Sequence, residues 1–389
     1  MDVMHQQRIK KGIYMIVEHF GVEAWMDRYE EGARYNITDT CAKPLTLAEL
    51  FAMAGEDPAD FMDRFCNRPQ TYGSIWGSTA LKEEIAKLYQ SVKAEEILTE
   101  HGATGGNQHI FFSLIRPGDR VIAYAPSYQQ FYSAPRSLGA HVTVLHLKKE
   151  NQYLPDVEEL RKAAEKGVRM ICLNNPNNPT GTLIPEAMMK EIVEIARTCG
   201  AYLFCDEVYA GVSYEGATCP SVADLYEKGI ATGSMSKAFS LAGLRLGWLA
   251  THDKEALAQF KKVRDYDLVS CGLFDEEMAT LALAHKDQIL KRNQEILRNN
   301  LPILDDWVQS EPHVSYVKPK AGTMALVHYD LDIPSRLFCH RMYYETGAFT
   351  VPGDCFLEPH SFRVGYGHDP EGLRVGLAAV SEFLKSNEK

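Results

Sequence analysis

The segment Thr232-Gly-Ser-Met-Ser-Lys-Ala-Phe-Ser-Leu-Ala-Gly-Leu-Arg-Leu-Gly247 gives the first indication of both fold and chemistry. Within it, Ser234 and Ser236 flank Lys237, and Arg245 follows on a glycine-rich connection. Glycines let the backbone approach a ligand closely, hydroxyls and an arginine can hold phosphate oxygens, and a lysine amine can attack a carbonyl carbon. The segment therefore indicates a site for a phosphorylated carbonyl compound, with a polar surface loop as the alternative.

Short apolar segments alternate with helical segments around this loop. Strands are predicted at residues 97–100, 120–124, 141–147, 170–173, 202–205, 230–232 and 246–250. Helices are predicted at residues 79–92, 107–115, 129–138, 156–165 and 185–199. This alternation is typical of an α/β fold, with a mostly parallel sheet and helices on both of its faces.

The pattern changes after residue 253, where long charged helical segments and few strands predict a smaller α+β domain. Helices are predicted at residues 254–264, 276–310, 334–346 and 372–385, and strands at 313–317, 324–328 and 362–366. Near the start of the chain we predict helices at 5–31 and 45–53, a strand at 35–38 and a loop-containing segment at 55–76. We expect three units: an N-terminal segment (1–44) packed on the small domain, a large domain (45–265) and the small C-terminal domain (266–389).

Composition limits the kinds of partner that the protein can have. The 389 residues carry a net charge of −11, which argues against binding nucleic acid or an anionic membrane surface. The nine cysteines include no Cys-x-x-Cys pair, so we expect neither a disulfide framework nor a metal site. We find no signal-peptide pattern and no apolar run long enough to span a membrane, and we therefore expect a cytoplasmic protein.

Polar residues follow four of the predicted strands, at the edge of the sheet where α/β proteins bind ligands. They are Thr104-Gly-Gly-Asn107, Ala125-Pro-Ser-Tyr128, Asn174-Asn-Pro-Asn-Asn-Pro-Thr-Gly181 and Asp206-Glu-Val-Tyr209. The first directly precedes a predicted helix, whose free amides favour a phosphate. The others offer a ring for stacking, amide groups, and a carboxylate for a cationic nitrogen. Each segment alone is also compatible with an ordinary turn.

Together with Ser234–Lys237 and Gly243–Gly247, these segments resemble the class I and II aminotransferases, enzymes of fold type I that depend on pyridoxal phosphate (PLP). The order and approximate spacing agree over roughly residues 70–385, and Phe362-Arg-Val-Gly-Tyr366 also fits. The resemblance implies PLP as cofactor and transfer of the amino group of an L-amino acid to a 2-oxo acid. It also implies a homodimer with shared active sites.

The resemblance also implies roles for single residues. Lys237 is expected to form the aldimine with PLP and then to move a proton as general base, for which a lowered pKa would be suitable. Asp206 is expected to pair with the pyridinium nitrogen, and Arg363 to hold the substrate α-carboxylate. The other expected cofactor contacts are Gly105, Gly106, Asn107, Ser234, Ser236 and Arg245 at the phosphate, Tyr128 on the ring face, Tyr209 and Asn178 at the 3′-oxygen, and Tyr72 from the neighbouring subunit.

Two segments depart from the family pattern, namely Asp39-Thr-Cys-Ala-Lys43 and Lys320-Ala-Gly-Thr323. They leave the side-chain preference of the substrate pocket open. His109 and Cys41 could face that pocket, but we interpret each of them as a packing residue.

Three functions remain open at this stage. The same lysine and aspartate would serve a PLP-dependent lyase, which eliminates a β- or γ-substituent as carbon–sulfur lyases do, or an amino-acid cyclase. A non-catalytic effector-binding module that only retains PLP is a third reading. Such modules are usually fused to a DNA-binding helix-turn-helix, which the acidic charge balance disfavours.

Overall fold

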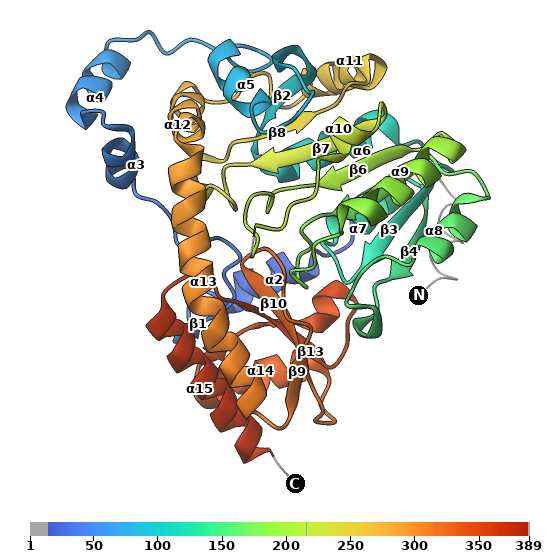
Figure 1. The fold of residues 1–389 in the computed structure, drawn as a ribbon, viewed down its shortest axis with the longest axis vertical. Helices are drawn as coiled ribbons and strands as arrows, with labels where there is room; N and C mark the ends of the chain where they lie inside the picture. The colour runs from blue at the N-terminus through green and yellow to red at the C-terminus, as the bar shows by residue number, and fades with distance from the viewer. Residues whose placement is uncertain (1–14, 215, 388–389) are drawn as a thin grey trace.

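A seven-stranded sheet forms the larger part of the computed structural model, which describes residues 15–214 and 216–387 (Figure 1). The strand order is β2-β8-β7-β6-β5-β3-β4. The strands are β2 (Ile97–Glu100), β3 (Arg120–Ala125), β4 (His141–His146), β5 (Met170–Asn174), β6 (Tyr202–Asp206), β7 (Gly229–Ser234) and β8 (Gly247–Ala250). β8 pairs antiparallel with both neighbours, and the other pairs are parallel, so the predicted mostly parallel sheet is confirmed. The reversal arises because the chain returns from β7 to β8 through the Lys237 loop, without the crossover helix that a parallel pair requires.

Helices cover both faces of this sheet, and alternate residues of a strand pack against opposite layers. Val121 of β3 belongs to the apolar cluster formed with helices α6, α7 and α11, whereas Ile122 belongs to the cluster that includes α8 and α9. Every residue of β5 and β6 is buried, as expected for strands covered on both sides. The helices around the sheet are α5 (Thr79–Ala86), α6 (Gly102–Leu114), α7 (Gln130–Ser137), α8 (Val157–Ala164), α9 (Glu186–Cys199), α10 (Val222–Leu225) and α11 (Lys254–Arg264).

A second, smaller layer contains an antiparallel sheet in the order β12-β13-β10-β9. Its strands are β9 (Val314–Tyr316), β10 (Met324–Tyr329), β12 (Val351–Pro352) and β13 (Ser361–Gly365), and its helices are α14 (Ser335–Thr346) and α15 (Pro370–Ser386). The long helix α13 (Lys286–Ser310) runs from the large sheet to this layer and packs on α15 (Figure 1). This arrangement agrees with the predicted smaller α+β part.

The N-terminal segment reaches the smaller layer. β1 (Tyr35–Asn36) pairs in parallel with β11 (Ala348–Phe349), and α2 (Gly21–Tyr29) contacts β12 and the short helix η4 (Gly353–Phe356). After β1, the chain passes close to the Lys237 loop, where the Leu45 amide donates to the Ser240 carbonyl, before it enters α3 (Leu47–Ala54). The division of the chain at residues 44 and 265 stays a prediction.

Several predicted boundaries differ from the structure. The predicted helix 5–31 lies partly outside the described residues, and its described part is helical only over α2. The predicted loop 55–76 contains α4 (Pro58–Cys66), which Asp57 caps ahead of a first-turn proline. The predicted helix 276–310 is two helices, α12 (Leu273–Ala284) and α13, separated at His285.

A further difference concerns the site directly. Helix α6 begins at Gly102 rather than at Asn107, because Gly102 takes a left-handed conformation (φ +68°) that starts the helix immediately after β2. Among the described residues, no helix is long and apolar enough to cross a membrane.

Candidate active site

Lys237 lies in the loop that follows β7 and is approached by the N-terminal segment. Its Nζ donates a hydrogen bond to Thr40 Oγ1 at 2.7 Å and lies 3.5 Å from Cys41 Sγ. The interpretation of Cys41 as a packing residue is therefore wrong, because its thiol contacts the lysine amine.

The protein raises the pKa of Lys237 above its ordinary value. Burial by itself lowers this pKa, but Tyr209, Cys41 and Asp39 raise it by a larger amount. The surrounding side chains thus act against the lowered pKa that we expected for a lysine beside a cationic cofactor.

Asp206 is the last residue of β6 and its carboxylate is buried. Asn107 Nδ2 donates to Oδ2 at 2.9 Å, and the Val208 amide donates to Oδ1 at 3.2 Å. Burial raises the pKa of Asp206 to about 6, although these hydrogen bonds and the charge of Lys237 lower it. Thr232 Oγ1 in turn donates to Asn107 Oδ1 at 2.9 Å and fixes the amide orientation. A buried carboxylate that its own donors compensate only partly is suited to a cationic partner.

Ser234, Ser236 and Arg245 converge with the first turn of α6. Arg245 Nη1 donates to Ser236 Oγ at 3.3 Å, and the Ser236 amide donates to Ser234 Oγ at 3.3 Å. A Cβ atom added to Gly102 would lie 2.9 Å from Arg245 Nη2, so the guanidinium lies directly against the start of the helix. Two hydroxyls, a guanidinium and a helix N-terminus form a cradle for a phosphate dianion.

The earlier start of α6 changes which amides face this cradle. The unpaired amides of a helix belong to its first turn, here residues 102–105. Gly105 lies in that turn, whereas Gly106 and Asn107 lie in the second turn. Asn107 approaches the site through its side chain, which contacts Asp206, instead of through its amide.

Arg363 lies on β13, is 4% exposed, and has an incomplete set of partners. Nη1 donates to Asn178 Oδ1 at 3.2 Å and Nη2 donates to the Thr38 carbonyl at 3.3 Å, whereas the buried Nε has no partner among the described residues. Burial lowers its pKa, but a guanidinium stays charged. A buried cation with an unpaired donor fits a ligand carboxylate.

The three tyrosines that we expected at the cofactor lie in different surroundings. Tyr209 is buried close enough to Lys237 and Arg363 for their charges to act on its hydroxyl, whose pKa burial raises. Tyr128 packs against Phe20, with ring centres 4.9 Å apart, and burial raises its pKa to about 12. Tyr72 is 79% exposed and is not brought to this cluster within one chain.

His109 is a packing residue, as predicted. Its two ring nitrogens contact Glu100 at 2.6 Å and Asp267 at 2.9 Å, and it is buried away from Lys237.

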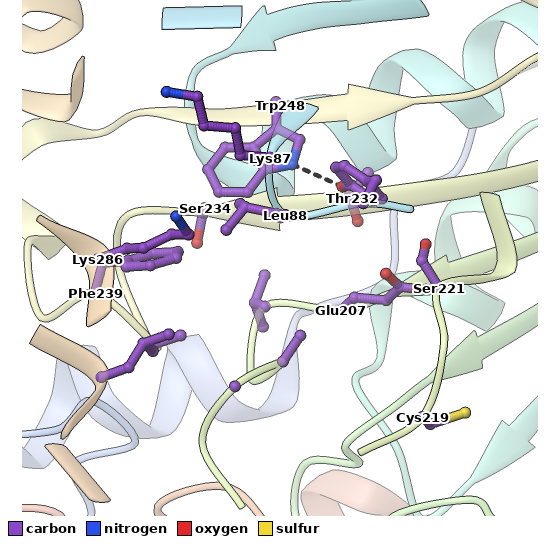
Figure 2. Close-up of a pocket in the computed structure, with 17 residues that line it drawn as sticks. Lys87, Leu88, Glu207, Cys219, Ser221, Thr232, Ser234, Phe239, Trp248 and Lys286 are labelled. Atoms are coloured by element: carbon purple, nitrogen blue, oxygen red, sulfur yellow. Dashed lines mark hydrogen bonds between the residues drawn. The ribbon is translucent and has the colours of Figure 1, made fainter. Parts of the chain in front are cut away.

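The cavity in Figure 2 has a volume of about 280 Å³, and its lining includes Ser234 of this cluster but not Lys237. Glu207, Trp248 and Lys286 also line it. Asp206, Arg363 and Tyr128 are also absent from its walls. The cavity therefore does not define the site described above.

Sequence reasoning missed two contacts, those of Thr38 and Thr40. Both lie in or beside the segment that departs from the family pattern, which was the only signal in the sequence. Thr40 and Lys237 are 197 positions apart, and local patterns do not predict such a contact.

Comparison with known proteins identifies the family. Residues 66–380 match the family model described as aminotransferase class I and II. The chain belongs to this family. Class I and II aminotransferases of this fold depend on PLP and act on small amino acid substrates.

Three similar proteins illustrate the range of this family. A PLP-dependent aminotransferase from Streptococcus suis 89-1591 superposes with a TM-score of 0.92 at 42% identity, over 96% of this chain and 99% of that one. Capreomycidine synthase from Streptomyces vinaceus is 25% identical over 95% of this chain and 94% of its own length. The PLP-dependent cyclase OrfR superposes with a TM-score of 0.88 at 24% identity, over 95% of this aminotransferase-family chain and 98% of the cyclase, which shows a shared fold.

Proposed function

We propose that this chain is a PLP-dependent aminotransferase that moves the amino group of an L-amino acid to a 2-oxo acid. The observation that carries the proposal is the adjacency of Lys237 and Arg363. Thr40 contacts the amine and Thr38 contacts the guanidinium, so one short segment holds both groups. An amine beside a carboxylate-binding cation is what an α-amino acid substrate requires.

The described residues fit the cofactor. Asp206 would pair with the pyridinium nitrogen, and Lys237 would hold the aldehyde carbon. The remaining contacts would be Ser234, Ser236, Arg245 and the first turn of α6 at the phosphate, Tyr128 at the ring face, and Tyr209 and Asn178 at the 3′-oxygen. When bound, PLP supplies an electron sink for the charge that develops at the substrate Cα.

The residues of the chain supply orientation and proton transfer. Arg363 binds the α-carboxylate with its free Nε and one terminal nitrogen, and this fixes the direction of the Cα–H bond. Lys237 Nζ would be the base that takes the proton from the substrate Cα and holds it for the return step. Asn178 Oδ1 accepts a hydrogen bond from Arg363 Nη1 and so helps to keep the guanidinium in place.

A second outcome at the same site is elimination or cyclisation. The similarity to capreomycidine synthase over 95% of the chain favours keeping this candidate, because that relative is named as a synthase and not as an aminotransferase. Lys237 and Asp206 would have the same tasks in all three reactions, so the products must distinguish them.

A single-turnover experiment tests the proposal. The PLP-loaded protein is mixed with each common L-amino acid, and with a panel of hydroxylated L-amino acids, in the absence of an oxo acid. Transamination yields stoichiometric 2-oxo acid and pyridoxamine phosphate. Release of ammonia with pyruvate indicates a lyase, and a cyclised amino acid with unchanged cofactor indicates a cyclase; either result replaces the proposal.

Replacing the lysine tests the assignment of the site. Lys237→Ala is expected to lower turnover by a factor of about 10⁴ or more, because one amine both links the cofactor and moves the proton. Lys286→Ala, in the lining of the cavity in Figure 2, serves as the matched control and should keep native turnover. Turnover by Lys237→Ala within tenfold of native would remove Lys237 from its role.

A further inference from the structure

The loop that covers Lys237 is held in place from several directions. Thr323 Oγ1 donates to the Thr40 carbonyl at 2.7 Å, and the Cys41 amide donates to Asp39 Oδ1 at 2.8 Å. The other oxygen of Asp39 lies 3.2 Å from Nε2 of His368. Because the backbone around Thr40 is anchored at both ends, its side chain meets Lys237 in a defined geometry.

Backbone hydrogen bonds strengthen this anchoring. The Gly365 amide donates to the Ile37 carbonyl at 2.8 Å, and the Lys43 amide donates to the Gly367 carbonyl at 2.7 Å. A Cβ atom on Gly365 would lie 1.8 Å from the Asp39 carbonyl oxygen, so the loop packs directly on the end of β13. The position of Thr40 is therefore tied to the strand that carries Arg363.

We propose that Thr40 is a catalytic residue whose hydroxyl directs the Lys237 amine during proton transfer. The 2.7 Å contact between Thr40 Oγ1 and Lys237 Nζ carries this proposal, which rests on the function proposed above. A hydroxyl has one donor hydrogen and two acceptor lone pairs. It can accept a hydrogen bond from the ammonium and donate one to the neutral amine, so it holds Nζ before and after the proton moves.

Two further contacts relate the position of the Lys237 amine to that of Arg363. Cys41 Sγ, at 3.5 Å, is a second and weaker acceptor for the ammonium. Thr38, two residues before Thr40, accepts from Arg363 Nη2 at 3.3 Å. The loop thereby fixes the lysine amine relative to the carboxylate clamp, and this distance determines whether Nζ reaches the Cα proton.

The first test uses protein without cofactor, so that it does not depend on turnover. Lys237 is acetylated with acetic anhydride over a range of pH, and its modification is followed by peptide mass spectrometry. Thr40→Val removes an acceptor from the ammonium and should shift the profile of Lys237 to lower pH by about one unit. Thr40→Ser, which keeps the hydroxyl, should leave the profile unchanged.

The second test uses the PLP-loaded protein and the amino acid that reacts fastest in the single-turnover panel. Thr40→Val and Thr40→Ala should lower the single-turnover rate about ten- to hundredfold and raise the isotope effect of α-deuterated substrate, with little change in apparent substrate affinity. Thr40→Ser should restore most of the rate. Thr198→Val, an exposed threonine on α9, is the matched control with native behaviour.

The outcomes separate this inference from the proposed function. Rates within twofold of native in both Thr40→Val and Thr40→Ala, or a Thr40→Ser variant as slow as either, would overturn the role of Thr40. If the Thr40 variants give either of these results and Lys237→Ala is inactive in the same assay, the proposed function stands and only the role of Thr40 is overturned. Turnover by Lys237→Ala would overturn both.

Discussion

Arg363 shows how a buried charge can prepare a site for a ligand. Its side chain leaves water almost completely, yet Nε has no partner among the described residues. An unpaired buried donor is costly, and a bidentate carboxylate would satisfy it. The contacts to Asn178 and Thr38 orient the guanidinium and leave one edge free.

Replacing this arginine by lysine should weaken substrate binding specifically. Arg363→Lys keeps the charge but loses the planar pair of donors, and the apparent dissociation constant for the amino acid should rise about a hundredfold. Stopped-flow absorbance of the PLP-loaded variant measures this constant, and PLP affinity serves as the internal control. An unchanged substrate affinity would remove Arg363 from the carboxylate role.

Asp206 should make the stability of the cofactor-free protein depend on pH. Its pKa is raised by burial to about 6, from an ordinary value of 3.8, so the folded state binds the proton more tightly than the unfolded state. Its carboxylate therefore costs no stability below pH 4 and up to about 3 kcal/mol above pH 6. Asp206→Asn should raise the melting temperature more at pH 7.5 than at pH 5, as scanning calorimetry can measure. A gain that is equal at both pH values would contradict this prediction.

Helix α6 is the element that makes this edge of the sheet suited to the proposed phosphate site. Its first residue follows β2 almost directly, and the left-handed conformation of Gly102 permits this tight connection. Arg245, itself left-handed at φ +48°, closes the cradle from the loop before β8. A glycine turn and a strained arginine turn thus place a guanidinium against the positive end of a helix, an arrangement that favours a bound anion.

A methyl group at the start of α6 should weaken phosphate binding. In Gly102→Ala the new Cβ would lie 2.9 Å from Arg245 Nη2, and the residue would have to adopt positive φ. We expect the affinity for PLP to fall about tenfold or more and the affinity for pyridoxal to change little. Gly200→Ala is the matched control, because Gly200 at the end of α9 has a similar positive φ of +71° and an added Cβ would meet nothing within 4 Å. Equal effects on PLP and pyridoxal, measured by equilibrium dialysis, would contradict the assignment.

At the scale of the whole molecule, two neighbouring loops carry exposed apolar side chains. Tyr72 and Tyr266 are 79% and 88% exposed, and Ile75 and Val269 are also exposed. Arg264 connects their two loops by donating to the carbonyls of Ile75 and Val269. Apolar side chains gathered on ordered loops are typical of a protein interface. We propose that this surface joins two copies of the chain and that Tyr72 enters the partner's site.

Mixing two inactive variants tests this arrangement. Lys237→Ala and Tyr72→Ala homodimers each carry two damaged sites. After they are unfolded and refolded together, half of the dimers are hybrids in which one site has both native residues, so activity should recover to about a quarter of native. The control mixes Lys237→Ala with Asp206→Asn. Both residues serve the site of their own chain, so neither site of the hybrid is native and no activity should be recovered. Without recovery in the first mixture, Tyr72 would not be shared between subunits.

The sequence by itself determined the elements of the large sheet, the family and most of the residues that we assign to the cofactor. Strand residues are apolar because both faces of the sheet are covered, and phosphate and ring contacts lie at strand ends, where the order along the chain predicts their meeting in space. Local patterns therefore made Lys237, Asp206 and Arg245 candidates, and the resemblance of the whole motif set to the family supplied their expected roles.

Only the tertiary structure decided which residues contact these groups. The start of α6 depends on the conformation of Gly102, and the partners of Arg363 and Lys237 come from a loop anchored on the smaller layer. Thr40 has no distinguishing local pattern, because a threonine in a loop is ordinarily a turn residue. Its contact with Lys237 joins two segments that are almost two hundred positions apart in the chain. Side-chain contacts across such a separation arise from the close packing of the folded layers. Periodicity along the chain does not encode this packing.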